Sequence, residues 1–242
     1  MSEEEVRTLP RVRARMHPDP LDLCMLLLGA AAGITDVIGY TKLGQVLPSA
    51  MTGNTALLGL ALGQDRLVAA SRSIAALLGF VAGGGVASFM LGEERPGPAA
   101  SIRVLAVEMV ALAMFAAIWI ATAPAFGGAA LYTMIVLAAV GMGMQSALAR
   151  RIDLPGITTV VFTSTLTAIV GALAGAIRKR DPLLPAAIRR QLSALAVYIA
   201  AAIVAGFAVW QGSEIVCALP FAAVAGAYLA QVRRKRTQGR TA

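Results

Sequence analysis

The stretch GITDVIGYTKLGQVLPSAMTGNTALLGLALG, from Gly33 to Gly63, decides how this chain folds. It contains an apolar helix, a short polar connection with a proline, and the threonine-rich start of a second apolar helix. A second stretch, GMQSALARRIDLPGITTVVFTSTLTAIVGALAG from Gly143 to Gly175, has the same three parts. A repeated pair of Gly/Pro-interrupted hydrophobic segments is the best sequence indication of a midplane binding site in a transporter. The pattern predicts a region for the site and identifies no substrate.

The composition predicts an all-α polytopic membrane protein. The chain has 242 residues, of which 58% are hydrophobic and 14% are charged, and its mean hydropathy is +0.74. Soluble domains carry about a quarter charged residues. Apolar runs long enough to cross about 30 Å of hydrocarbon recur along the chain. These runs lack the strict alternation of membrane β-barrel strands.

The apolar segments predict one membrane domain over residues 21–232. Prolines fall between the segments, and no low-complexity linker divides the chain. We expect six to eight apolar segments, in two sequence-related halves at about 21–122 and 128–231, with interrupted or re-entrant helices. The segments are 21–41, 49–64, 73–92, 103–122, 128–149, 157–177, 190–210 and 214–231.

The relation between the halves extends beyond the opening pair of stretches. Gly33 corresponds to Gly143, and Phe80 of the third segment corresponds to Tyr198 of the seventh. Small residues recur in both copies at the spacing that close helix contacts in lipid require, and Gly83–Gly85 is expected to be a packing face. The alternative is that all Ala/Gly/Leu-rich helices resemble one another.

The number of membrane crossings stays open on sequence alone. If segments 49–64 and 157–177 are re-entrant, six helices cross and the second half is inverted relative to the first. Segment 157–177 has about 21 residues, which is long enough to span, and eight helices then cross. The distribution of Lys and Arg differs little between the two arrangements.

Basic residues lie in the two tails, residues 1–20 and 233–242, and in the loops, and the net charge is +8. The positive-inside rule accounts for these charges if both termini are cytoplasmic, and anionic lipid headgroups would attract them further. Nucleic acid is the alternative partner, but the basic residues form no amphipathic face. We expect the lipid bilayer as the partner and no nucleic acid.

Asp36 is the most informative single residue of the sequence. It lies some fifteen residues into the first apolar segment, where a carboxylate costs several kcal/mol unless it is protonated, paired or in a water-filled cavity. Thr35 and Tyr40 can present their hydroxyls to overlapping faces of the same helix. The alternative to a functional site is a packing or interfacial carboxylate that neighbouring hydroxyls satisfy.

The Met51–Thr55 run (MTGNT) is the second candidate site. A half-helix that begins here would direct its free amides and positive dipole end at an anionic group, whereas the alternative is an ordinary N-cap. The run Phe162–Thr167 (FTSTLT) is its counterpart in the second half, and Gln145 corresponds to Thr35. The candidate substrate- or ion-binding residues are Thr35, Asp36, Tyr40, Thr52, Gly53, Asn54, Thr55, Gln145, Thr163, Ser164, Thr165 and Thr167.

The remaining charged groups favour structural roles. Glu108 lies about a turn and a half into segment 103–122, so we expect an interfacial ion pair or a snorkelling charge. Arg150 is expected to be an interfacial anchor, and His17, the only histidine, lies in the N-terminal tail. The sequence has no hydrolase, metalloprotease or phosphate-loop signature. We therefore expect no enzymatic activity, no metal site and no cofactor.

The Gly33–Gly63 stretch resembles the YoaK-like family of bacterial inner-membrane proteins, long described as a domain of unknown function. Gly33 and Asp36 match the Gly-x-x-Asp pattern of that family, and Met51–Asn54 matches its Met-Thr-Gly-Asn motif. The second half resembles the family's second signature, although Ser164 stands where we expect the family's glycine. The resemblance covers about residues 20–232. It implies a multi-pass protein of the bacterial inner membrane with about six spans, and no established substrate.

These features predict a secondary transporter or permease for a small polar or anionic solute, with Asp36 as the group that would couple protons or bind a cation. A channel built from the same residues is one alternative. A non-transporting membrane scaffold or assembly protein is another, and small-residue helix faces would allow a homodimer.

Overall fold

The computed structural model describes residues 19–123, 127–152, 162–179 and 185–239, without the side chains of residues 162–164 and 179. All elements within these ranges are helical. Most of the expected N-terminal tail and the first residues of segment 157–177 lie outside the described residues. In chain order the elements are α1 (Pro20–Lys42), α2 (Met51–Gly63), α3 (Leu67–Leu91), α4 (Pro98–Thr122), α5 (Gly128–Ile152), α6 (Phe162–Lys179), α7 (Ala186–Trp210), the 3₁₀ helix η2 (Glu214–Ala218) and α8 (Leu219–Gln238).

Six helices in the described part of the chain are long and apolar enough to cross a membrane: α1, α3, α4, α5, α7 and the joined η2–α8. α2 has 13 residues, about 20 Å at 1.5 Å per residue, which is shorter than the hydrocarbon layer of about 30 Å. α6 is not among these six, and its described stretch Thr165–Arg178 is a shorter apolar helix. The all-α polytopic membrane fold is confirmed, with six candidate spans among the described helices.

The helices extend beyond the predicted segments at their polar ends. α4 begins at Pro98 rather than at residue 103, because proline at the first position of a helix is pre-organised for it. α8 continues through Arg233–Gln238, which was expected to be part of the tail. Basic residues are favoured in the last turn because they complement the helix dipole. Apolarity marks only the membrane-embedded part of each helix.

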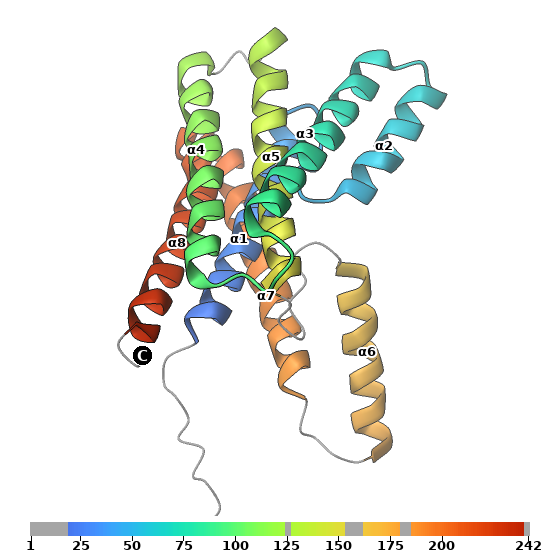
Figure 1. Ribbon diagram of the computed structural model, residues 1–242. Coiled ribbons are helices and arrows are strands. Elements are labelled where there is room, and N and C mark those ends of the chain that lie inside the picture. The colour runs from blue at the N-terminus through green and yellow to red at the C-terminus, as the bar shows by residue number, and fades with distance from the viewer. Residues whose placement is uncertain (1–18, 124–126, 153–161, 180–184, 240–242) are drawn as a thin grey trace, which may run out of the picture.

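The packing partners follow a repeated scheme (Figure 1). α3 packs on α5 and α1 packs on α7. α1 also contacts α8, as α4 contacts α5, and α4 packs on α8. α2 lies against α3, and α6 lies against α7. Exchanging each helix of the first half for its counterpart in the second half reproduces these pairs. The common sequence origin of the halves stays a prediction.

Glycines allow the closest crossing, that of α3 with α5. A Cβ atom on Gly83 would overlap the carbonyl oxygen of Val140, and one on Gly143 would overlap the carbonyl oxygen of Phe80. The expected packing face is therefore confirmed at Gly83. Gly85 does not belong to it, because a Cβ atom there would meet nothing within 4 Å.

The crossing of α1 with α7 is built in the same way. A Cβ atom on Gly33 would lie 2.6 Å from the carbonyl oxygen of Tyr198. Gly33 corresponds in sequence to Gly143, and Tyr198 corresponds to Phe80. In both crossings, the corresponding glycine thus meets the backbone of the corresponding aromatic residue.

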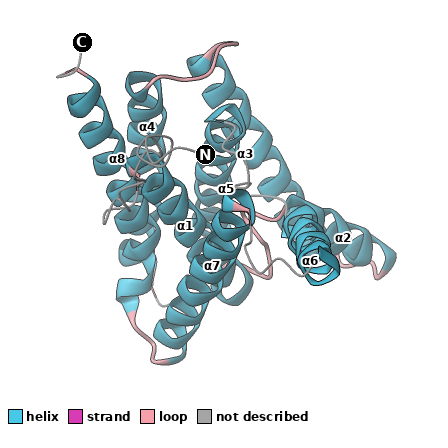
Figure 2. Cartoon of the chain, turned by 90° about the horizontal axis from the view of Figure 1, so that it is seen from below, coloured by secondary structure: helices cyan, strands magenta, loops and turns pink. Residues whose placement is uncertain are grey.

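The two short helices lie on one side of the bundle, and both views agree on this (Figure 1, Figure 2). α2 lies nearer one end of the bundle and α6 nearer the other, and each begins at the end that is closer to the other helix (Figure 1). α1 begins and α8 ends at the same end of the molecule, the lower end in Figure 1.

Candidate functional site

Asp36 joins three parts of the chain. Its side chain is only 4% exposed, and its carboxyl group accepts three hydrogen bonds. The backbone N–H of Ser49 donates to Oδ1 at 2.8 Å, and the Ser49 hydroxyl donates to Oδ2 at 2.5 Å. The hydroxyl of Tyr198 on α7 donates to Oδ2 at 2.8 Å. Asp36 therefore holds the α1–α2 connection and α7 against α1.

Two glycines on α1 make this arrangement sterically possible. Gly33, three residues before Asp36, admits the α7 backbone at Tyr198. Gly39, three residues after Asp36, admits the returning chain, because a Cβ atom there would lie 2.5 Å from both the Val46 carbonyl oxygen and Pro48 Cδ. Residues three apart on a helix share a face. The two close approaches therefore bring the donors to the carboxyl group from opposite sides along the helix.

Asn54 fixes the same connection from the other end. The Leu47 N–H donates to Asn54 Oδ1 at 2.9 Å, and Asn54 Nδ2 donates to the Leu47 carbonyl oxygen at 2.7 Å. Asn54 is fully buried and belongs to the first turn of α2. The Met-Thr-Gly-Asn motif thus holds the connection to α2 while Asp36 holds it to α1.

We expect Asn54→Ala to destabilise the protein by about 1–3 kcal/mol, because the N–H and carbonyl groups of Leu47 lose their partner. The measurement is the thermal unfolding of the detergent-purified protein, followed with a thiol-reactive dye. Both cysteines are buried in the folded chain, so the dye reports unfolding. Thr55→Ala is the control, since the exposed Thr55 hydroxyl bonds only to its own helix at Met51. Equal melting temperatures for the two variants would contradict the role of Asn54.

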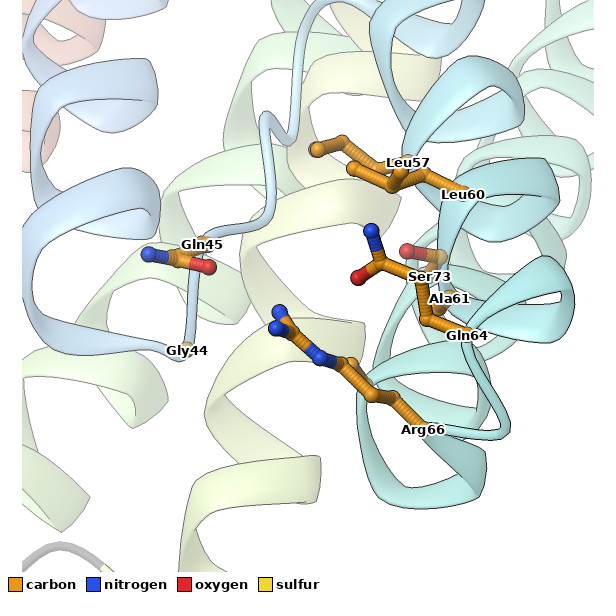
Figure 3. A pocket seen from close by; sticks show the side chains of 9 residues that line it. Gly44, Gln45, Leu57, Leu60, Ala61, Gln64, Arg66 and Ser73 are labelled. Atoms are coloured by element: carbon orange, nitrogen blue, oxygen red, sulfur yellow. The ribbon is translucent and has the colours of Figure 1, made fainter.

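A small surface pocket lies beside the same connection. The turn Gly44–Gln45, the end of α2 at Gln64, and Arg66 and Ser73 contribute its polar lining (Figure 3). Both turn residues have positive φ, which turns the chain sharply after α1. Asp36 and Asn54 do not line the pocket. They hold the segment of chain that forms one of its walls.

The other predicted site residues are dispersed. The Thr35 hydroxyl donates to the carbonyl oxygen of Ala31 in its own helix. Gln145 is buried, and its Nε2 donates to the Leu28 carbonyl oxygen at 3.0 Å. Leu28 lies about two helical turns before Asp36 on α1. Gly53 packs against Leu47. Tyr40, Thr52, Thr55 and Thr167 are exposed, Thr165 is buried, and the side chains of Thr163 and Ser164 lie outside the described residues.

Sequence reasoning missed Ser49 and Tyr198 as partners of Asp36, and it missed the pocket. One signal was available for Tyr198. It is a polar residue on an apolar helix, at the position where the other half has Phe80. Gly39 and Pro48 indicated a chain reversal after α1. Asp36 and Tyr198 are 162 residues apart in the sequence. Their contact can therefore be predicted only when it is known which helices pack together.

The interpretation of Glu108 as an interfacial or snorkelling charge is wrong. Glu108 is fully buried, and α4 begins five residues earlier than expected, which moves Glu108 away from the helix end. Arg150 is exposed at the end of α5, and nothing in the structure brings it towards Asp36.

Comparison with known proteins supports the resemblance seen in the motifs. Residues 24–230 match the family described as protein of unknown function (DUF1275). The chain is 34% identical over 186 residues to the UPF0700 transmembrane protein YoaK of Bacillus subtilis (strain 168), covering 74% of this chain and 80% of that protein. No solved structure matches the chain significantly. The chain is a multi-pass membrane protein and belongs to the DUF1275 family.

Proposed function

We propose that the protein is a secondary transporter or permease for a small polar or anionic solute, coupled to protons through Asp36. The observation that carries this proposal is the position of Asp36. One buried carboxyl group holds both α7 and the connection to a helix too short to span. Ionisable residues inside a membrane are expensive and mark substrate or ion pathways.

The coupling step follows from hydrogen-bond chemistry. An ionised carboxylate has only acceptor sites, whereas a protonated carboxyl carries one O–H donor. When Asp36 takes up a proton, it therefore accepts the three donors of Ser49 and Tyr198 less well. We expect the contacts of the α1–α2 connection and α7 with α1 to be weaker in the protonated state, but not lost, because the two hydroxyls can rotate to accept the carboxyl proton. Release of the proton restores the three bonds and strengthens the contact.

The pocket beside the connection is the proposed solute site. Arg66 contributes a positive charge, and Gln45, Gln64 and Ser73 contribute hydrogen-bonding groups. The pocket is smaller than typical small-molecule sites, so only a small solute or ion would fit. Gln45 lies four residues before Ser49 on the connection. Movement of that connection therefore links the protonation of Asp36 to the shape of the solute site.

The repeated packing scheme supports alternating access. Inverted repeats that rock against each other around a fixed site are the usual basis of such transport. The crossings at Gly33 and Gly143 are sterically alike, but the position that corresponds to Asp36 in the second half is Ser146. We propose that re-entrant α2 and α6 face each other across the membrane. The α1–α7 and α3–α5 crossings would open in turn. Only the α1–α7 crossing, next to Asp36, would be controlled by a proton.

The expected orientation places the lower end of Figure 1 in the cytoplasm of a bacterial inner membrane. α1 begins and α8 ends there, and Arg189, Arg190 and Arg233–Arg236 belong to helix ends on that side. The positive-inside rule assigns such an end to the cytoplasm. The pocket, next to the upper ends of α1 and α2, would then open to the outside.

A ligand screen tests the proposal. The purified protein is heated with a panel of organic acids, amino acids, phosphates and inorganic ions at several pH values. A ligand at one hundred times its dissociation constant stabilises the folded state by about 2.7 kcal/mol. We expect stabilisation by at least one solute that disappears in Arg66→Gln and persists in Arg103→Gln. In Asp36→Asn, the pH dependence of binding should disappear. A ligand bound equally well by all variants would contradict the proposed site.

A non-transporting membrane scaffold is the second candidate, favoured by the complete set of donors around Asp36. In that function Asp36 serves only to hold the fold. Asp36→Asn would then change neither solute binding nor its pH dependence, while a change at Gly83 would abolish function through misfolding.

A further inference from the structure

A buried polar cluster lies inside the apolar core that α1, α4, α5 and α8 form. Its acidic member is Glu108 of α4, which is fully buried and whose two carboxyl oxygens have no hydrogen-bond partner. The side-chain oxygens of Gln145 on α5 and Gln231 on α8 are also buried and without a partner. Four oxygen atoms in this core, and the Gln231 amide nitrogen, thus have no hydrogen-bond partner.

The contacts of these residues place them in one region. Glu108 packs beside Gly141, one helical turn before Gln145 on α5. Gln145 Nε2 bonds to the Leu28 carbonyl oxygen. The Cys24 thiol, one turn earlier on α1, belongs to the same buried core as Ala227 and Ala230 of α8. α1 therefore lies against both α5 and α8 over a single turn.

α4 runs antiparallel to α5 and α8 (Figure 1). The cluster combines α1 and α4 of the first half with α5 and α8 of the second, which is where inverted-repeat transporters hold coupling ions.

A proton or a bound cation would give the Glu108 carboxyl group the partner that it lacks. Burying an isolated carboxylate costs far more than burying a hydrogen-bonded group. One carboxyl group balances one unit of charge, and amide and carboxyl oxygens are ligands that hard cations prefer. The described residues contain no group of three or more His, Cys, Asp or Glu that could hold a metal ion. This ligand set favours a monovalent cation over a transition metal.

We propose that Glu108, Gln145 and Gln231 form a binding site for one monovalent cation, either a proton or an alkali-metal ion, between the two halves. This site is separate from Asp36, and its occupancy is an equilibrium property that does not depend on the proposed transport. The titratable groups facing it are Cys24 of α1 and Arg234 of α8, which both act on the same region, and Tyr228 of α8, which packs against this core. The α5 face contributes the uncharged Gly141 and Gln145.

Thermal unfolding of the full-length protein in detergent tests the site. The melting temperature is measured against pH in choline chloride, and then at fixed pH with NaCl or KCl replacing choline at constant ionic strength. A proton site raises the melting temperature as pH falls, and an alkali-ion site raises it saturably with Na⁺ or K⁺. Glu108→Gln should lose that dependence, while Glu93→Gln, in the exposed α3–α4 loop, should keep it. Identical curves for the wild-type protein and Glu108→Gln would overturn the proposal.

Two further measurements apply if Glu108→Gln does not fold. Gln231→Leu keeps the carboxyl group but removes one oxygen ligand, so cation affinity should fall about tenfold, as expected for loss of one charge-assisted contact. Infrared spectra of the Asp36→Asn protein should show a buried carboxylic C=O band that disappears with rising pH or with added Na⁺ or K⁺. A band that responds to none of these changes, together with an unchanged affinity in Gln231→Leu, would also overturn the site.

Discussion

Replacing Asp36 by alanine is expected to destabilise the folded protein by about 3 kcal/mol or more. Three donors lose their acceptor at once: the N–H and hydroxyl of Ser49 and the hydroxyl of Tyr198. A buried donor left without a partner costs about 1–3 kcal/mol. Thermal unfolding with the thiol-reactive dye measures the loss. Asp65→Asn is the matched control, because Asp65 is exposed and has a positive φ that asparagine tolerates.

Asp36→Asn distinguishes hydrogen bonding from charge. The amide oxygen can accept from the Ser49 N–H, and the two hydroxyls can rotate to accept from the amide nitrogen. We therefore expect Asp36→Asn to retain most of the stability that Asp36→Ala loses. A double-mutant cycle with Tyr198→Phe isolates the α1–α7 bond: the double variant should lose less stability than the sum of the single variants. Strict additivity would show that the Tyr198 bond contributes nothing to the fold.

The sequence was sufficient to predict the helices but insufficient to predict which residues of different helices contact one another. Periodicity and hydropathy located the helices to within a few residues, and Asp36 and Met51–Asn54 stood out because polar groups in apolar runs are costly. Their roles depended on Leu47, which contributes its backbone N–H and carbonyl groups, and on Ser49, which contributes its backbone N–H and its hydroxyl. The positions of these groups follow from the fold of the chain after α1, which hydropathy does not describe.

Glu108 is a buried residue that the sequence placed near the membrane surface. Distance from the predicted segment start at Arg103 placed it there, although the apolar run already begins at Pro98. The helix itself begins at Pro98. Its burial depends on α5 and α8, far along the chain, and no local pattern reports their positions.

Gly83→Leu is expected to have the largest effect of any single substitution in the α3–α5 crossing. The first side-chain atom would overlap the Val140 carbonyl oxygen, and backbone atoms of a packed helix cannot move away by changing rotamer. Overpacking a core usually costs about 1–3 kcal/mol, and an overlap with backbone lies at or above the upper end of that range. We expect poor yield of folded protein and, where it can be purified, a sharply lower melting temperature in the dye assay.

Gly85→Leu is the control on the same helix, because a Cβ atom at Gly85 meets nothing within 4 Å. It adds the same apolar side chain and the same gain in helix propensity, so any difference between the two variants reports the crossing alone. Gly143→Leu should behave like Gly83→Leu, since its Cβ atom would overlap the Phe80 carbonyl oxygen from the opposite helix. If Gly83→Leu and Gly85→Leu unfold at the same temperature, α3 and α5 do not cross at these glycines. The correspondence with the Gly33–Tyr198 crossing would then lose its physical basis.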